Sequence, residues 1–149
     1  MKKEDLGFCK KIIEKCLENS IEYKPEVIDF LRKEFNELDY FKLRANKGGI
    51  FVFEEKGIIK GMGCADGNWI RKVFVDPDFK NVKIWEKIMD YLEKIIFSEG
   101  FKEIFLYAYP NLKNICLKRG YSIVEEKIFG KGKLNFVGIK MKKSSTVAP

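Results

Sequence analysis

The stretch VFVDPDFKNVKIWEKIMDYLE, from Val73 to Glu93, decides the fold. Its first residues end an alternating apolar run, Asp76-Pro77-Asp78 is typical of a turn, and the remainder has helical spacing. A strand that turns into a helix presents the free N–H groups of the first helical turn at its end, where they attract anions. The turn contains no glycine, which raises the question of whether its backbone can still approach a phosphate.

The helix that follows Phe79 has the clearest pattern in the chain. Its apolar side chains repeat at helical spacing from Ile84 to Ile96, and charged side chains occupy the opposite face. The charged residues predicted to face solvent are Lys83, Glu86, Lys87, Asp90, Glu93 and Lys94. Gly100 is predicted to end the helix.

Strands are predicted on both sides of this helix. Before it, residues 50–55, 58–65 and 69–75 form an antiparallel meander, in which Gly61 and Gly63 allow another backbone to approach closely. After it, residues 103–109 form a buried strand, and the strand-helix-strand order favours a parallel pair. Two further strands are predicted over 122–129 and 133–141.

Helices are predicted on either side of this strand-rich region. A helix over 3–19 carries one apolar stripe, Pro25 begins a second helix, and a short third helix covers 111–118. The resulting order is α-α-β-β-β-α-β-α-β-β. It predicts one α+β domain over 1–143, with a mixed, mainly antiparallel sheet flanked by helices, and a flexible tail over 144–149.

The composition narrows the class of protein. The chain has 149 residues, of which 46% are hydrophobic, and this suits one domain with a substantial core. No apolar run approaches the ~18 residues of a membrane span, and the N-terminus lacks the apolar core of a secretory signal, so we expect a cytoplasmic protein. The absence of histidine excludes mechanisms of the Ser-His-Asp and Cys-His types.

Cysteine spacing and charge limit the possible partners. The four cysteines are scattered without a C-x-x-C pair, so neither a disulfide framework nor a metal site is expected. The net charge of +7 favours an anionic partner such as a nucleotide. Lysines are spread along the whole chain and no nucleic-acid-binding motif is present, so a nucleic acid is not expected.

Two local patterns resemble the GNAT superfamily of acetyl-CoA-dependent N-acetyltransferases. One is the strand ending in Val75-Asp76-Pro77 with its loop and long helix; the other is Asn111, a short helix and Gly120-Tyr121. The resemblance covers residues 50–141 and the two leading helices, although the family's usual first strand would have to come from 1–3 or 40–43. It implies acyl transfer, from acetyl-CoA to a small-molecule or protein amine, and allows a homodimer.

The resemblance also implies where coenzyme A binds. Backbone groups of the strand 71–75, splayed from its neighbour 103–107, would bind the pantetheine arm as they would bind a peptide. Amides at the start of the helix would bind the pyrophosphate. The implied cofactor-binding residues are Val73, Phe74, Val75, Lys80, Asn81, Val82, Lys83, Ile84, Trp85 and Asn111.

The phosphate loop departs from the family pattern. That pattern is Arg or Gln, two residues, Gly, one residue, then Gly or Ala; here it is KNVKIW, with Lys83 and Trp85 at the small positions. In one interpretation the amides still point into the site, and Lys80 and Lys83 offset the poorer approach. In the other, Trp85 fills the site, and the protein is a catalytically weak or inactive module of this fold. We favour retained but weakened binding.

Candidate catalytic residues lie near the end of the parallel strand. Cys116 occupies the position where many relatives carry a tyrosine, and its thiol could protonate a thiolate or be acylated; burial in the core is the competing interpretation. Tyr109, where the strand enters its loop, is the preferred acid, with Cys116 second. Asp66, Glu54, Glu55 or a water could act as the base. Direct transfer in a ternary complex is expected, because no histidine can activate the thiol.

Overall fold

The computed structural model describes residues 5–18, 25, 49–79, 82–129 and 136–145. The strands within these ranges are β1 (Ile50–Glu55), β2 (Ile58–Asp66), β3 (Trp69–Val75), β4 (Glu103–Ala108), β5 (Ser122–Phe129) and β6 (Phe136–Ser144). The helices are α1 (Leu6–Glu18), α4 (Val82–Ser98) and α5 (Lys113–Lys118), with short 3-10 turns η2 (Pro77–Phe79) and η3 (Pro110–Leu112).

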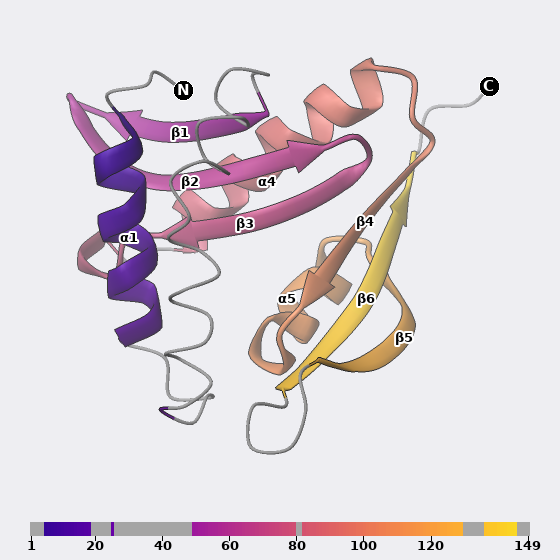
Figure 1. Ribbon diagram of the computed structural model, residues 1–149. Coiled ribbons are helices and arrows are strands. Elements are labelled where there is room, and N and C mark those ends of the chain that lie inside the picture. The colour runs from indigo at the N-terminus through magenta and orange to yellow at the C-terminus, as the bar shows by residue number, and fades with distance from the viewer. Residues whose placement is uncertain (1–4, 19–24, 26–48, 80–81, 130–135, 146–149) are drawn as a thin grey trace.

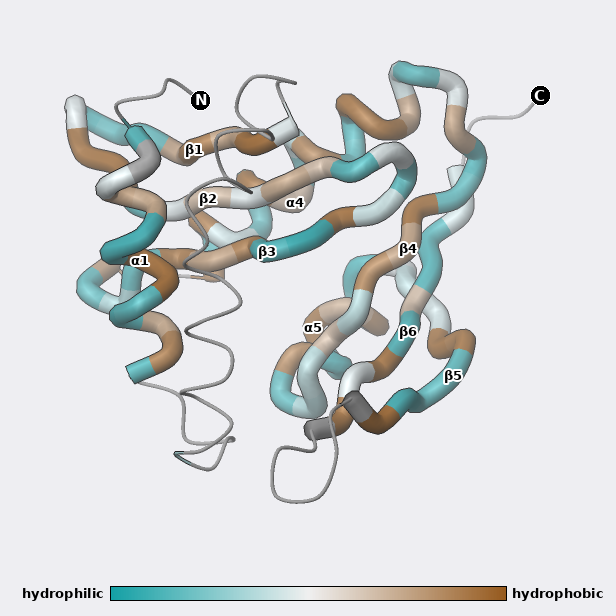
Figure 2. Tube along the Cα trace, in the orientation of Figure 1, coloured by the Kyte–Doolittle hydropathy of each residue, from teal (hydrophilic) through white to brown (hydrophobic). Residues whose placement is uncertain are grey.

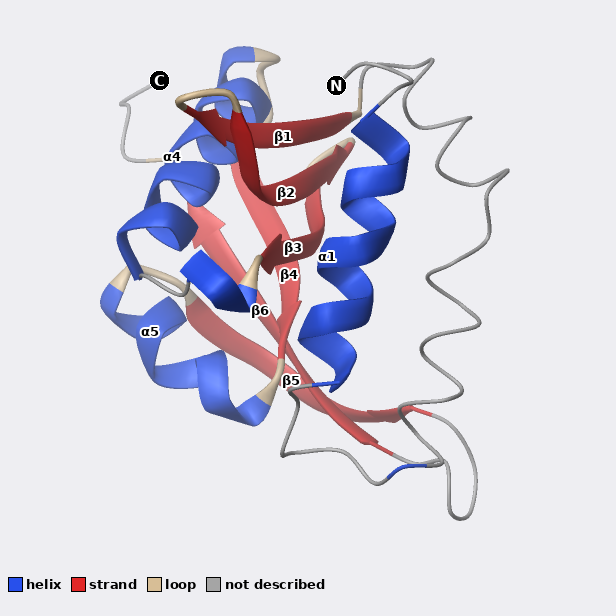
Figure 3. Ribbon diagram, turned by 90° about the vertical axis from the view of Figure 1, so that its left-hand side faces the viewer, coloured by secondary structure: helices blue, strands red, loops and turns tan. Residues whose placement is uncertain are grey.

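The six strands form one sheet, in the order β1-β2-β3-β4-β6-β5. All neighbours are antiparallel except β3 and β4. Helix α1 lies on one face of the sheet, and α4 and α5 lie on the other (Figures 1 and 3). The predicted fold class, a mixed and mainly antiparallel sheet flanked by helices, is therefore confirmed.

Two glycines of β2 let α4 pack closely on the meander. A Cβ atom at Gly61 would lie 2.7 Å from Ile88 Cδ1, and one at Gly63 would lie 2.7 Å from Leu92 Cδ1. Both distances are too short for a real contact. The close approach of α4 to these glycines is made by side-chain atoms, whereas the sequence predicted the approach of a backbone.

The larger part of the core lies between the sheet and α4. Apolar stretches of the strands and helices are visible in Figure 2, and the helix contributes Ile84, Ile88, Met89, Leu92 and Ile96 to the buried cluster. On the opposite face, α1 buries a smaller set, namely Cys9, Ile12, Ile13 and Leu17. Each face of the central strands is thus covered by a helix stripe of the predicted helical spacing.

The prediction that Glu93 faces solvent is wrong. Glu93 is only 6% exposed, and its carboxylate accepts hydrogen bonds from Arg119 Nε at 2.7 Å, Lys143 Nζ at 2.8 Å and the Tyr121 hydroxyl at 2.8 Å. Arg119 also pairs with Asp90. A charged group can be buried when it is paired and hydrogen-bonded in this way. Its partners lie on β6 and on the segment between α5 and β5, so the pattern of α4 alone could not predict them.

Some expectations lie outside the described residues. They are the second helix beyond Pro25, both candidates for a first strand, and the last residues of the tail. Strand β6 continues to Ser144, one residue past the predicted domain boundary, and the Ser145 N–H donates to the Lys102 carbonyl at 2.8 Å. None of the helices in the described ranges is long and apolar enough to cross a membrane.

Candidate active site

The parallel strands β3 and β4 are joined at one end only. Their ladder contains a single pair, Trp69 with Phe105. The Phe105 N–H donates to the Asn68 carbonyl at 2.9 Å, and the Asn68 side-chain amide donates to the Glu103 carbonyl at 3.2 Å. Beyond this closed end the two strands diverge (Figure 1). We call this arrangement the β3–β4 split; its facing strand edges can bind an extended, amide-containing ligand.

A bulge in β3 marks the beginning of the split. Met62 pairs with Phe74 while Cys64 pairs with Arg71, so Gly63 lies opposite two residues of β3. One of them, Lys72, has a φ of 54°, which is rare for a residue with a side chain. The extra residue resets the alternation of the strand, and bulges also increase local twist. The bulge therefore accounts physically for the divergence of β3 from β4.

After the bulge, β3 points its apolar side chains toward α4. Val73 and Val75 pack against the core cluster, as Ile70 does before the bulge. Without the inserted residue, this face would receive Lys72 in place of Val73. Val73, Phe74 and Val75 thus follow the split on β3, as the cofactor prediction requires, and the Val75 carbonyl already accepts a bond from Cys16 Sγ at 3.2 Å.

The turn after β3 is held by a carboxylate instead of glycine. Asp76 is buried, its N–H donates to the Lys60 carbonyl at 2.8 Å, and its Oδ1 accepts from the Asp78 N–H at 2.9 Å. Lys15 of α1 bridges both carboxylates, with its Nζ 3.3 Å from Asp76 and 2.7 Å from Asp78. This network fixes the path from β3 toward α4.

The first turn of α4 carries no acidic residue. Its N–H groups and the positive end of the helix dipole are therefore not offset by a nearby carboxylate on the helix. Val82 and Lys83 are exposed, whereas Ile84 is buried. Trp85 packs against the core, with its ring centroid 6.0 Å from the Arg119 guanidinium, so packing alone explains this tryptophan.

The remaining predicted cofactor residues are Asn111, Lys80 and Asn81. Asn111 is exposed in η3, directly after β4. Lys80 and Asn81 lie outside the described residues. The described part of the predicted site thus consists of the β3 edge, the start of α4 and the loop after β4.

The two candidate acids occupy different environments. Tyr109 follows the last residue of β4, at the open end of the split, and is half-buried. Cys116 of α5 is 2% exposed and belongs to the core cluster. Burial raises the pKa of the Cys116 thiol to about 11. A buried, protonated thiol favours the packing interpretation of Cys116 and leaves Tyr109 as the better placed acid.

The candidate bases also differ in position. Asp66 lies opposite Trp69 in the β2–β3 ladder, near the closed end of the split, with its Oδ2 3.6 Å from Arg71 Nε. Glu54 and Glu55 lie on the edge strand β1, and a hydrogen bond from Lys60 lowers the pKa of Glu55. Of these three candidate bases, Asp66 is therefore the one that the fold brings nearest to the closed end.

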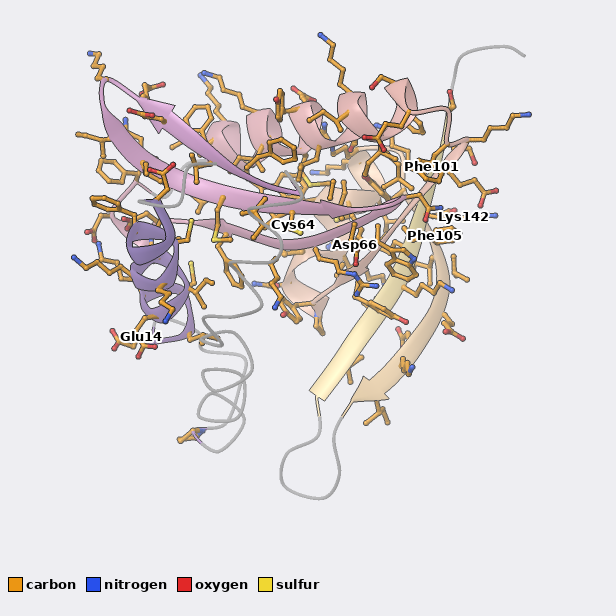
Figure 4. All side chains as sticks on the ribbon, turned by 45° about the horizontal axis from the view of Figure 1, so that its top comes forward. Glu14, Cys64, Asp66, Phe101, Phe105 and Lys142 are labelled. Atoms are coloured by element: carbon orange, nitrogen blue, oxygen red, sulfur yellow. The ribbon has the colours of Figure 1, made fainter. Side chains whose placement is uncertain are left out.

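An aromatic cluster at the closed end was not predicted from the sequence. The Trp69 ring lies 5.3 Å from both Phe105 and Tyr107, measured between ring centroids. We call these three rings the aromatic platform. The strand pairing places Asp66, Trp69, Phe105 and Lys142 in one row across β2, β3, β4 and β6. Figure 4 shows Asp66, Phe105 and Lys142 in this region. The alternation of these aromatic residues in two strands is visible in the sequence. Their contact can be predicted only once the register of the parallel strands is known.

Comparison with known families agrees with this architecture. The sequence profile of the acetyltransferase (GNAT) family matches residues 10–117. The chain belongs to this family. The assignment confirms the prediction of an acyl-CoA-dependent N-acetyltransferase with acetyl-CoA as its cofactor.

Solved structures resemble this GNAT chain over nearly its whole length. A GCN5-related N-acetyltransferase from Rhodopseudomonas palustris has a TM-score of 0.85 at 20% identity, covering 95% of this chain and 91% of that one. The PaiA N-acetyltransferase of Thermoplasma acidophilum, in complex with coenzyme A, has a TM-score of 0.74 at 17% identity, covering 97% and 96%.

The putative acetyltransferase YncA of Salmonella typhimurium, solved with its cofactor acetyl-CoA, has a TM-score of 0.70 at 16% identity, covering 100% of this chain and 94% of that one. At such identities these likenesses show the shared fold. Among curated proteins, none matches this sequence.

Proposed function

We propose that this protein transfers an acetyl group from acetyl-CoA directly to an amine while both substrates are bound. The observation that carries the proposal is the β3–β4 split, which is closed at Trp69 and Phe105 and widens beyond them. Helix α4, with no acidic residue in its first turn, follows β3 after a short turn. A ligand that joins an extended amide chain to an anionic group fits this arrangement, with the chain in the split and the anionic group at the start of α4.

The described residues fit coenzyme A. Backbone groups of Val73, Phe74 and Val75 would hold the pantetheine arm along the edge of β3. The N–H groups of the first turn of α4 would hold the pyrophosphate, and the exposed Lys83 would add positive charge. When bound, acetyl-CoA supplies an activated acyl thioester. Trp85 packs against the core, which supports retained binding over a filled site.

The chain's own residues would orient the amine and move protons. Asp66, near the closed end of the split, would accept a proton from the amine directly or through a water. The Tyr109 hydroxyl would donate a proton to the CoA thiolate that leaves when the amine takes the acetyl group. A buried Cys116 thiol with a raised pKa is a poor nucleophile, which supports direct transfer over an acyl-cysteine. Holding the amine against the thioester would supply much of the rate.

The experiment is a transfer assay on three matched proteins. Acetyl-CoA-dependent acetylation of an amine panel, followed as thiol release and by mass spectrometry, should occur with the wild-type chain. Tyr109→Phe should lower kcat about tenfold or more, with the CoA affinity unchanged by calorimetry. Cys116→Ala should stay within a few-fold of wild type.

Two results would contradict the proposal. A stoichiometric acetyl adduct on Cys116, formed at the rate of turnover, would replace direct transfer by a covalent route. Binding of acetyl-CoA with no transfer to any amine would favour the inactive-module alternative.

Two further expectations stay predictions. None of the four cysteines, all within the described residues, is in a disulfide; this is typical of proteins in reducing compartments and supports a cytoplasmic location. A homodimer is tested by sedimentation equilibrium.

A further inference from the structure

Two cations lie over the same indole ring at the closed end of the split. The Arg71 guanidinium is 4.8 Å, and Lys140 Nζ is 5.5 Å, from the Trp69 ring centroid. Lys140 Nζ is also 5.1 Å from the centroid of Phe105. Cation–π attraction explains each contact separately, but two like charges beside one ring also repel each other.

Nearby carboxylates offset this positive charge only in part. Asp66 pairs with Arg71 at 3.6 Å, and Glu103 pairs with Lys142 at 3.9 Å; both distances are long for a hydrogen bond. Glu125 lies opposite Lys140 in the β5–β6 ladder. Even so, Lys140 forms no ion pair with a carboxylate of the described residues, and its Nζ instead lies over the two aromatic rings.

These cations and rings share the sheet face that is turned away from α4. Ile104 and Leu106 of β4 are buried in the core against α4. Phe105 and Tyr107 alternate with them and therefore point to the other face. The platform sits at the closed end of the split, and Asp66 is in the same row as Trp69. Arg71 and Lys140 therefore lie on this face beside the closed end of the split, next to the position proposed for the amine.

We propose, on the basis of the function proposed above, that the acceptor is an amine that also carries an anionic group, a carboxylate or a phosphate. Arg71 and Lys140 bind this anion beside the Trp69 indole. Binding there relieves the repulsion between the two cations and adds charge-assisted hydrogen bonds. The amine end of the same molecule then extends toward Asp66, which is next to Trp69 in the sheet.

The test compares amines that differ only in the anion. Phenylalanine is paired with phenethylamine, which lacks the carboxylate, and O-phosphoethanolamine is paired with ethanolamine, which lacks the phosphate. With the wild-type protein we expect kcat/KM to be about tenfold or more higher for the anionic member of at least one pair. The pair that shows the larger ratio tells a carboxylate from a phosphate.

Variants then assign the preference to the two cations. Lys140→Met keeps an apolar stem over the rings and removes the charge. It should reduce the ratio of kcat/KM between the anionic amine and its neutral partner to about threefold or less, by raising KM for the anionic amine. Arg71→Met should act in the same direction. Lys94→Met, on the exposed face of α4, is the matched control and should leave the ratio unchanged. Equal kcat/KM values within both pairs, or a ratio that survives Lys140→Met, would overturn the proposal.

A binding measurement separates this inference from the proposed function. The chain has two tryptophans, so Trp85→Phe leaves Trp69 as the only indole fluorophore. This variant is titrated with each amine in the presence of desulfo-CoA. Half of the quenching of Trp69 fluorescence should occur at an about tenfold lower concentration of the anionic amine than of its neutral partner. Such a difference without any acetyl transfer would uphold the anion site and refute the transferase, whereas equal titrations would refute the anion site.

Discussion

At the scale of single residues, the Glu93 carboxylate joins α4 to β6 and to the segment between α5 and β5. Its side chain is 8% exposed, and those of Arg119 and Lys143 are 13% and 21% exposed. Removing one partner of a buried ion pair leaves the other charges without compensation. We therefore expect Glu93→Gln to lower the free energy of unfolding by about 3 kcal/mol, measured by urea denaturation. Glu86→Gln, exposed on the same helix, is the control and should change it by less than about 0.5 kcal/mol.

The Tyr121 hydroxyl makes the same network sensitive to alkali. Burial and the neighbouring Glu93 carboxylate raise the pKa of Tyr121 well above its ordinary value. A raised pKa in the folded state means that this stabilisation is complete below about pH 10, the pKa of an unfolded tyrosine, and is lost as the pH rises further. Tyr121→Phe should therefore flatten the fall in urea midpoint between about pH 9 and 11.

Tyr91→Phe provides the comparison for this alkaline titration, because Tyr91 is 52% exposed on α4. Lysines titrate over the same pH range and contribute to the slope of every variant. The difference between the Tyr121 and Tyr91 variants isolates the buried phenol. Identical slopes for these two variants and wild type would refute the assignment.

At the scale of elements, the sequence predicts the meander and α4 nearly to the residue because hydrophobic periodicity is a local property. The parallel contact of β3 with β4 follows from chain order and handedness. The bulge at Lys72 was not predictable, since WIRKVFV contains no glycine or asparagine to mark a positive φ. The burial of Glu93 and the aromatic platform likewise depend on residues far apart in the chain.

Lys72 provides a test of the bulge. With φ at 54°, a β-branched side chain is strongly disfavoured there, whereas glycine adopts this conformation without a steric penalty. We expect Lys72→Val to be less stable than Lys72→Gly by about 1–2 kcal/mol, measured by thermal or urea unfolding. Lys127 in β5 has no positive φ, and there the order should reverse, because valine is favoured in strands. The same order at both positions would contradict the bulge.

Two substitutions of Lys83, at the start of α4, distinguish the effect of its charge on CoA binding from the effect of its bulk. Lys83→Met retains most of the side-chain volume and removes the charge, so it should weaken CoA binding by about three- to tenfold in calorimetry. Lys83→Gly also removes the bulk, and it should bind CoA more tightly than Lys83→Met if the side chain obstructs the phosphates. Lys94→Met, near the other end of α4, should leave the affinity unchanged.

If all these variants bound CoA with equal affinity, Lys83 would not be a cofactor-binding residue. The double change to glycine at Lys83 and Trp85 is less informative, because Trp85 packs against the core and its loss destabilises the fold.

At the scale of the whole molecule, the split divides the sheet into two halves, and a cofactor bound in it would contact both. β1, β2 and β3 lie on one side of the split, and β4, β6 and β5 lie on the other. In the described residues, the β3–β4 ladder connects these halves through one pair. A pantetheine arm bound along the split would add hydrogen bonds between the halves and would therefore stabilise the folded state.

Thermal unfolding with three ligands tests this directly. At about 100 times its Kd, acetyl-CoA should stabilise the protein by about 2.7 kcal/mol, which corresponds to a rise in Tm of about 5–10 °C for a chain of this length. Desulfo-CoA keeps the pantetheine arm and should give a similar shift at the same concentration, whereas ADP lacks the arm and should give a much smaller one. Raising the salt concentration should weaken all three shifts, because the net charge of +7 attracts each anion. If ADP and desulfo-CoA shifted the Tm equally, the arm would contribute nothing, and the split would not be the cofactor site.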